Sequence, residues 1–434
     1  MASCRTVKGG VCSAKGFRAA GVAAEIKYKG RNDVALVVAD APCAAAAVFT
    51  TNKVAAAPVL YDREVLRRQE CRRPELQDAD GFSAGAATFL SPRGNGPLVQ
   101  AILANSGCAN ACTGEQGLRD AKLSALVTAG ELGIDPRHVL VASTGVIGRP
   151  LPMDRLLAGM KAAAKKLGRT PAHGLAAEKA VMTTDTKPKE ACAKTTVGGK
   201  TVTVGGMSKG SGMIEPNMAT MLGFITTDAA ITPAMLKRAL SLAIAKSFNR
   251  LVVDGDESTN DSVFLLASGK AGNRTIAKGG KDFDAFRAAL EAVCVSLARQ
   301  MATDGEGATK FVTVTVKGAR SEKDAARAAR AVAKSPLAKT SWFGRDPNWG
   351  RVLAAVGYSG ADVVDMKTEV FYDRVWAFKC GKVADAAQLK RLAKVLKKDA
   401  FEVVVDLHLG KGESSVYTCD FSLDYVHINA DYTT

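Results

Sequence analysis

Strand-like apolar runs and capped amphipathic segments follow one another along the whole chain without a regular βαβα order, and no other feature limits the possible folds as strongly. Short apolar runs predict strands, whereas apolar residues that recur every three or four positions predict helices. A chain that mixes the two irregularly favours a layered, mixed α+β architecture over a doubly wound one. We expect strands at 34–41, 201–206, 250–256, 310–318 and 401–410, and helices that begin near 232, 282, 321 and 385.

The segment after residue 231 has the clearest helix signals. Thr232 suits the N-cap, and Pro233 suits the first helical position because the N–H that proline lacks would be unpaired there. The inward faces of this helix and of the next one are Met235, Leu236, Leu240 and Ala243, and Phe286, Leu290, Val293 and Leu297. By contrast, residues 62–96 are polar and turn-rich, which predicts an irregular surface excursion.

Composition and charge exclude several classes of protein. Hydrophobic residues make up 47% of the 434 residues and charged residues 24%, as in an ordinary globular protein. No apolar run approaches the roughly 18 residues that span a bilayer, and the basic start lacks the apolar segment of a signal peptide. We therefore expect no membrane partner and a cytoplasmic protein, or a plastid or mitochondrial one if the source is a eukaryote.

The cysteines raise the question of a metal site, and the basic residues raise that of a nucleic-acid or phosphate-bearing partner. The ten cysteines are scattered without a C-x-x-C pair, and Cys108 and Cys112 have no neighbouring histidine, so we expect reduced thiols and no metal site. The net charge of +16 permits a phosphate-bearing or nucleic-acid partner. However, the basic runs at 66–73, 161–169 and 389–398 lack the interleaved aromatic residues of a stacking surface, so we expect no nucleic-acid partner.

The chain lacks the common catalytic motifs. Its four histidines stand in no nucleophile or metal arrangement, and there is neither a phosphate-binding G-x-x-x-x-G-K-[ST] loop nor a dinucleotide-binding G-x-G-x-x-G turn. What remains is a set of glycine-rich polar segments within apolar sequence. Such segments are turns individually, but together they are typical of loops that build a site on a rigid scaffold. They are 105–114, 142–148, 182–189, 205–213, 253–261, 303–310 and 343–351.

One threonine within these segments has a possible chemical role. In "KGSGMIEPNMATMLGFITTDA" (209–229), Thr220 follows Ala219 in an apolar run, where an ordinary strand threonine is the simplest interpretation. A threonine hydroxyl can also attack the preceding carbonyl, split the chain and expose an amine that serves as its own base. The small Ala219, the surrounding glycines and the charge of Lys209 are compatible with that chemistry.

The same run, from 205 to 229, resembles the cleavage signature of the ornithine acetyltransferase family. Members of that family are glutamate N-acetyltransferases of arginine biosynthesis that cleave themselves at an Ala-Thr bond. The resemblance covers nearly the whole chain except 62–96. It extends to "KGFRAAG" (15–21), "VFTTNKVAAAPV" (48–59), "STGVIG" (143–148), "MTTDT" (182–186), "SFNRLVVDGDESTND" (247–261), "DGEGATK" (304–310), "GRDPNWGR" (344–351) and "DYVHINADYTT" (424–434).

The resemblance implies a role for each matching residue. Thr220 is then the nucleophile of self-cleavage and of acetyl transfer, and cleavage after Ala219 leaves an α chain, 1–219, and a β chain, 220–434. Thr144 and Gly145 form the oxyanion hole. Lys209 lies beside the nucleophile and binds substrate, and Glu306 binds substrate and moves a proton. The remaining substrate-binding residues are Thr183, Asn429 and Thr434.

Further expectations follow from the family. The fold is an α/β sandwich-like core of two interlocked chains that assemble as an α₂β₂ heterotetramer. The substrates are N²-acetylornithine and glutamate, with no cofactor, and some members also use acetyl-CoA as a donor. Two positions depart from the family pattern, Cys108 in "NSGCAN" and Glu257 in "DGDESTND". The alternatives are an amidase or aminopeptidase with the same kind of nucleophile, and a non-catalytic basic binding protein.

Overall fold

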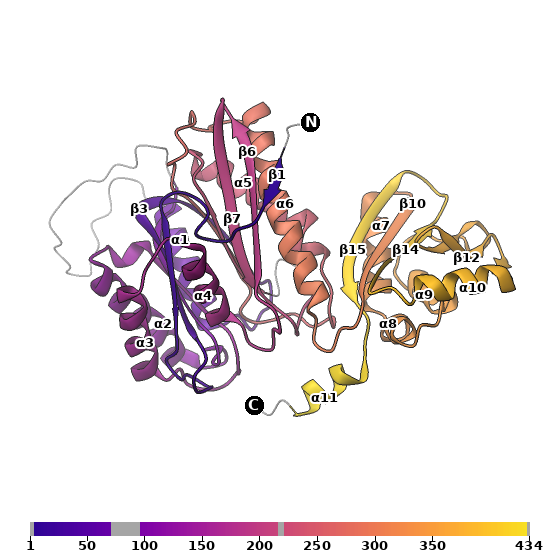
Figure 1. Ribbon diagram of the computed structural model, residues 1–434, viewed down its shortest axis with the longest axis horizontal. Helices are drawn as coiled ribbons and strands as arrows, with labels where there is room; N and C mark the ends of the chain where they lie inside the picture. Colours follow the sequence, from indigo (N-terminus) through magenta and orange to yellow (C-terminus); the bar gives the residue numbers. More distant parts are fainter. Residues whose placement is uncertain (1–3, 71–95, 216–220, 432–434) are drawn as a thin grey trace.

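The computed structural model describes residues 4–70, 96–215 and 221–431, which form two packed units (Figure 1). The first unit contains strands β1 (Arg5–Val7), β2 (Phe17–Val22), β3 (Val34–Phe49), β4 (Leu98–Asn105), β5 (Val139–Ser143), β6 (Lys189–Val197), β7 (Lys200–Lys209), β8 (Leu222–Thr227) and β9 (Ser262–Ala267). Its helices are α1 (Ala57–Glu70), α2 (Gly114–Leu132), α3 (Met153–Lys165), α4 (Pro171–Val181), α5 (Pro233–Lys246) and α6 (Lys281–Thr303).

The second unit follows α6. Its strands are β10 (Phe311–Ala319), β11 (Glu369–Tyr372), β12 (Val375–Lys379), β13 (Lys382–Val383), β14 (Ala400–Asp406) and β15 (Gly412–Cys419). Its helices are α7 (Glu322–Lys334), α8 (Pro336–Phe343), α9 (Trp349–Gly357), α10 (Ala386–Val395) and the last one, α11 (Leu423–Asp431). In the second sheet, β10 lies between β14, which is parallel to it, and β15, which is antiparallel.

The first sheet consists of two halves that pack face to face, and the long strand β3 belongs to both. Its first part, 34–38, pairs with β2 and β4, and its last part, 44–49, pairs with β9 after a register irregularity. Ala35 and Val37 face a core that also contains Phe224 and Phe264 of the other half, whereas the alternate residues face α2 and α3. Helices α5 and α6 cover the outer face of β7 to β9. The expected layered α/β sandwich is therefore confirmed.

The expected helix starts are also confirmed, because capping side chains lie at each of three predicted positions. The Thr232 hydroxyl accepts from the Met235 N–H at 3.4 Å, and the side chains of Ser321 and Asp385 cap α7 and α10 in the same way. The residues expected on the inward faces of α5 and α6 are buried. The strands expected at 34–41, 201–206, 310–318 and 401–410 appear within β3, β7, β10 and β14, which ends earlier, at Asp406.

Two expectations about local structure are wrong. Residues 250–256 form no strand: Phe248–Arg250 is a 3₁₀ turn, and the Asp254 carboxylate accepts the N–H groups of Met213 and Ile214 at 2.6 and 2.7 Å, which holds this segment as a loop. Residues 62–70 belong to helix α1, which buries Asp62 against the N–H of Val141. The rest of that polar stretch, 71–95, lies outside the described residues.

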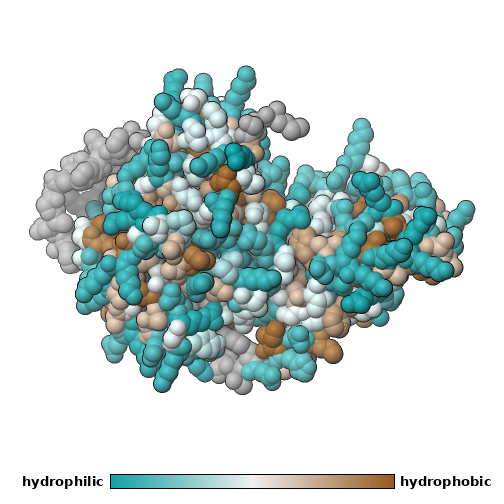
Figure 2. Space-filling view, in the orientation of Figure 1, coloured by the Kyte–Doolittle hydropathy of each residue, from teal (hydrophilic) through white to brown (hydrophobic). Residues whose placement is uncertain are grey.

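The surface described by the structure is mostly hydrophilic, with separate apolar patches (Figure 2). One patch belongs to α11, where Leu423 and Val426 are 68% and 61% exposed. No helix among the described residues is both long and apolar enough to cross a membrane. The basic residues of 161–165 and 389–395 lie on helices α3 and α10.

Candidate active site

Six of the seven polar segments singled out in the sequence are joined by contacts around the start of β8, whereas 343–351 lies between α8 and α9 in the second unit. The expected cleavage residues, Ala219 and Thr220, lie outside the described residues, as does Thr434. Their neighbours are well placed: Lys209, at the end of β7, is the antiparallel partner of Leu222, at the start of β8. Lys209 is therefore beside the first described residues that follow the expected nucleophile.

Lys209 contacts another of the expected substrate-binding residues. Its ammonium donates to the Thr183 hydroxyl at 3.3 Å. Burial lowers the pKa of Lys209, and the carboxylates of Asp185, Asp261 and Glu306 oppose that shift. The ammonium is thus surrounded by acidic side chains from three separate segments, which suits a position that receives an amino acid with a carboxylate and an amine.

Glu306 and Asn429 are brought together from opposite ends of the second unit. The Asn429 side chain donates to the Glu306 carboxylate at 2.9 Å, and Glu306 itself is only 8% exposed. The Glu306 N–H donates to the Ser211 carbonyl at 2.9 Å, which fixes this loop beside the segment that follows Lys209. Helix α11 thereby returns from β15 to the site, where it packs against Gly307, whose φ is +65°.

Thr144 and Gly145 follow β5 in a segment that is held from several sides. The Thr144 N–H donates to the Asn105 carbonyl at 3.0 Å, so the donors that this segment can offer an oxyanion are the Thr144 hydroxyl and the Gly145 N–H. Gly145 has φ +130°, and a Cβ there would lie 2.6 Å from the Cys108 nitrogen. Only glycine fits this close approach of two backbone segments.

Asn260 links the Thr144 segment to the start of β8. Its side-chain amide donates to the Ala109 and Ser143 carbonyls at 2.6 and 2.8 Å. The next residue, Asp261, accepts a hydrogen bond from the backbone N–H of Met221, and burial raises its pKa well above the ordinary range. The carboxyl group of Asp261 therefore lies directly beside the residue that follows Thr220.

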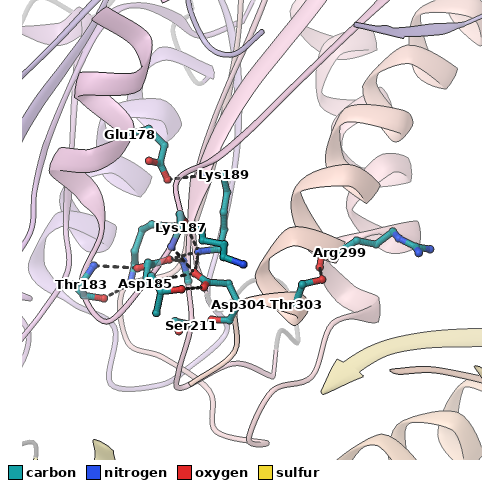
Figure 3. A network of polar contacts seen from close by, with 12 residues as sticks. Glu178, Thr183, Asp185, Lys187, Lys189, Ser211, Arg299, Thr303 and Asp304 are labelled. Carbon is teal, nitrogen blue, oxygen red and sulfur yellow. Dashed lines mark hydrogen bonds and ion pairs between the residues drawn. The ribbon is translucent and has the colours of Figure 1, made fainter. Parts of the chain in front are cut away.

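A buried ion-pair network lies next to Thr183 and Ser211 of the site (Figure 3). Lys189 Nζ lies 2.7 Å from Asp185 Oδ1 and 2.6 Å from Asp304 Oδ2, and all three side chains are at most 5% exposed. Asp185, Lys189 and Asp304, like Asn260 and Asp261, stand in segments that the sequence marked as polar loops. Their roles were missed because Lys189 and Asp304 are 115 positions apart, and sequence spacing carries no sign of that contact.

The two departures from the expected family pattern lie beside these segments, and Cys108 forms a β-bridge with Thr144. Cys108 is buried behind the Thr144 segment, where its thiol donates to the Arg149 carbonyl at 3.4 Å. Glu257 is exposed, and its carbonyl accepts from the Asn52 side chain. Among the described residues, no three His, Cys, Asp or Glu side chains lie close enough together to hold a metal ion.

Comparison with known proteins gives consistent matches. The ArgJ family model matches residues 18–434. The chain is 49% identical over 420 residues to the arginine biosynthesis bifunctional protein ArgJ of Geobacter sulfurreducens, covering 97% of this chain and 99% of that one. It is 43% identical over 440 residues to the glutamate N-acetyltransferase of Methanocaldococcus jannaschii, covering 99% and 100%. A solved structure of ArgJ from Bacillus halodurans is 40% identical and covers 49% of this chain and 100% of that one, with a TM-score of 0.47.

Proposed function

Because the chain belongs to the ArgJ family, we propose that it moves an acetyl group from N²-acetylornithine to glutamate through an acetyl-enzyme formed on Thr220. The chain is an acetyltransferase of arginine biosynthesis, and its substrates are small molecules. The observation that carries the detailed proposal is the convergence of Thr183, Lys209, Glu306 and Asn429 beside the first residues of β8.

The first half-reaction forms the acetyl-enzyme. The free amine of Thr220 takes the proton of its own hydroxyl, and the hydroxyl oxygen attacks the acetyl carbonyl of the donor. The negative charge on the carbonyl oxygen is stabilised by the Thr144 hydroxyl and the Gly145 N–H. The amide C–N bond then breaks, and the proton passes to the leaving amine of ornithine. The positive charge of Lys209 lowers the pKa of the Thr220 amine, which keeps it available as a base.

The second half-reaction returns the enzyme to its starting state. The amine of glutamate attacks the acetyl ester and loses a proton to the Thr220 amine or to Glu306. The ester C–O bond then breaks, and the same base returns that proton to the departing Thr220 oxygen. Thr183, Lys209 and Asn429, together with Thr434, hold the amino-acid portion common to both substrates. This chemistry needs no cofactor, because the nucleophile and the base belong to the same residue.

Self-cleavage after Ala219 leaves two chains, 1–219 and 220–434, that stay interlocked. Strand β7 of the first chain pairs along β8 of the second, and β3 pairs along β9, so the sheet continues across the junction. We propose further that the two chains assemble as an α₂β₂ heterotetramer in the cytoplasm, or in a plastid or mitochondrion of a eukaryote. The exposed Leu423 and Val426 support assembly, because contiguous apolar surface favours burial.

Membership of the family disfavours the two alternatives. An amidase or aminopeptidase would pass the acetyl group to water and release acetate, whereas a transferase makes N-acetylglutamate when glutamate is present. A basic nucleic-acid-binding protein would remain a single chain and bind in a strongly salt-dependent manner. Acetyl-CoA is proposed as a second donor because relatives are described as bifunctional.

Intact mass measurement on the denatured protein, followed by product analysis, tests the proposal. Wild-type protein should separate into the two chains, and Thr220→Ala should remain uncut. Wild-type protein should convert N²-acetylornithine and glutamate to ornithine and N-acetylglutamate, and acetyl-CoA should replace the donor. Release of acetate at the same rate with or without glutamate would show hydrolysis instead of transfer.

A further inference from the structure

Lys189 is a buried lysine that has no role in the proposed reaction, and its ammonium joins two polar segments of the site, 182–189 and 303–310. Its ammonium contacts Asp185, Asp304 and, at 3.1 Å, the Lys187 carbonyl (Figure 3). Burial acts to lower the pKa of Lys189, but the two carboxylates outweigh it and raise that pKa, so the group is charged. A cation in this position, with its hydrogen bonds satisfied, is fixed in one geometry.

The first carboxylate of this network holds two segments that carry substrate-binding residues. Asp185 accepts the N–H of Thr183 at 3.0 Å and the N–H of Gly210, which follows Lys209, at 2.7 Å. Lys189 and Lys209 together keep the pKa of Asp185 below its ordinary value although burial acts to raise it. The position of Asp185 therefore sets the positions of both Thr183 and Lys209.

The second carboxylate holds the segment that carries Glu306. Asp304 accepts the N–H groups of Thr186 and Lys187 at 3.0 and 3.2 Å, and its carbonyl accepts the Ser211 hydroxyl at 2.6 Å. Two residues later, Glu306 bonds to the Ser211 carbonyl. Asp304 belongs to the proposed second chain and Lys189 to the first, so the Lys189–Asp304 pair joins the two chains at the site.

We infer that Lys189 is a positioning residue that sets Thr183 and Lys209 of the first chain against Glu306 of the second, so that one substrate contacts all three. The inference rests on the proposed function, because it assigns those three residues to substrate binding. Removing one partner from a buried ion pair leaves the other charges uncompensated, so the two carboxylates should move apart. A shift of about 1 Å in groups that orient a substrate lowers kcat/KM by about 10²-fold.

The test compares kcat/KM for N²-acetylornithine and for glutamate in wild-type protein, Lys189→Met, Lys189→Arg and Lys339→Met. Lys339 is the matched control: it is another fully buried lysine, and its ammonium bonds to Thr418 and to the Cys419 carbonyl within the second unit. Each rate is divided by the concentration of cleaved protein, which is measured by intact mass. Asp304→Asn is a milder variant that leaves the Lys189–Asp185 pair in place.

In Lys189→Met, kcat/KM should fall by about 10²-fold for both substrates. An increase in KM should account for more of this fall than a decrease in kcat. Lys189→Arg, which keeps the charge, should recover most of that loss, Asp304→Asn should show a smaller loss, and Lys339→Met should lower thermal stability while its kcat/KM stays near wild type. If Lys189→Met does not accumulate as folded protein, the kcat/KM of Asp304→Asn relative to wild type decides whether the network positions the substrate-binding residues.

One result would overturn the positioning role of Lys189, and another would overturn the proposed acetyl transfer. Wild-type kcat/KM in cleaved Lys189→Met or Asp304→Asn, with only the thermal stability reduced, would show that the network supports folding and nothing more. Wild-type protein that makes no N-acetylglutamate would refute the proposed function, and the inference would fall with it.

Discussion

Replacing Gly212 by alanine tests whether the position of Glu306 matters, because the added methyl group would push the Glu306 carboxylate aside. A Cβ built at Gly212 lies 2.6 Å from Glu306 Oε1 and closer still to Oε2. Ordinary contacts between non-bonded heavy atoms need about 3.5 Å, so the carboxylate must move by about 1 Å. The backbone of Gly212 is not in the left-handed region that favours glycine, so the substitution adds a methyl group without backbone strain.

The displacement of Glu306 should lower kcat/KM by about 10²-fold, equivalent to about 2.7 kcal/mol of transition-state binding. Steady-state acetyl transfer is measured with each substrate varied, and cleavage is checked by intact mass. The matched control is Gly130→Ala in α2, where the new Cβ has no atom within 4 Å. This control should keep wild-type kcat/KM and gain about 0.5–1 kcal/mol of stability from helix propensity.

The outcome is decisive for Glu306 in either direction. If fully cleaved Gly212→Ala transfers acetyl groups with wild-type kcat/KM, the Glu306 carboxylate cannot be a precisely positioned member of the site. A reduced kcat/KM accompanied by an equal reduction in Gly130→Ala would point to a general effect of the added methyl groups.

Three further substitutions test other parts of the site. Asn429→Ala removes the 2.9 Å hydrogen bond to Glu306 and should lower kcat/KM about tenfold in the same assay, whereas unchanged kinetics would exclude this pair from substrate binding. Gly145→Ala places a Cβ 2.6 Å from the Cys108 nitrogen at φ +130° and should lower kcat by about 10²-fold or more; a wild-type kcat would show that this segment does not bind the oxyanion. Burial raises the pKa of Glu178 from 4.5 to about 8, so between these values the folded protein holds a proton that the unfolded chain has lost, and stability falls as the pH rises. Glu178→Gln should remove that fall, which amounts to about 5 kcal/mol at most, and thermal midpoints from pH 5 to 8 that fall equally in both proteins would contradict it.

The sequence predicted the elements whose signals are local. Helices α5, α7 and α10 begin where a capping side chain precedes an apolar period, and β7, β10 and β14 coincide with apolar runs. Helix α1 was missed because its polar, arginine-rich sequence resembles a loop, and its burial depends on Asp62 reaching β5. The sequence also did not predict that β3 belongs to both halves of the sheet, because this depends on which strands pair with each part of β3.

The candidate site was predicted residue by residue from family resemblance, and the structure adds its connections. It brings Lys209 to Thr183 and Glu306 to Asn429, although members of each pair come from different segments. The network centred on Lys189 could not be found from the sequence, because Asp304 is 115 positions from Lys189 and only the fold buries the two together with Asp185. Long-range contacts of this kind are properties of the fold and leave no local pattern.

Thr220 is proposed to carry the acetyl group between the two substrates. The most direct measurement is the intact mass of both chains after the protein is incubated with N²-acetylornithine alone, denatured and separated. One acetyl group is expected on the chain that begins at residue 220, located on Thr220 by fragmentation and lost when glutamate is added before denaturation. An unmodified 220–434 chain in a protein that still makes N-acetylglutamate, or an acetyl group on another residue, would contradict it.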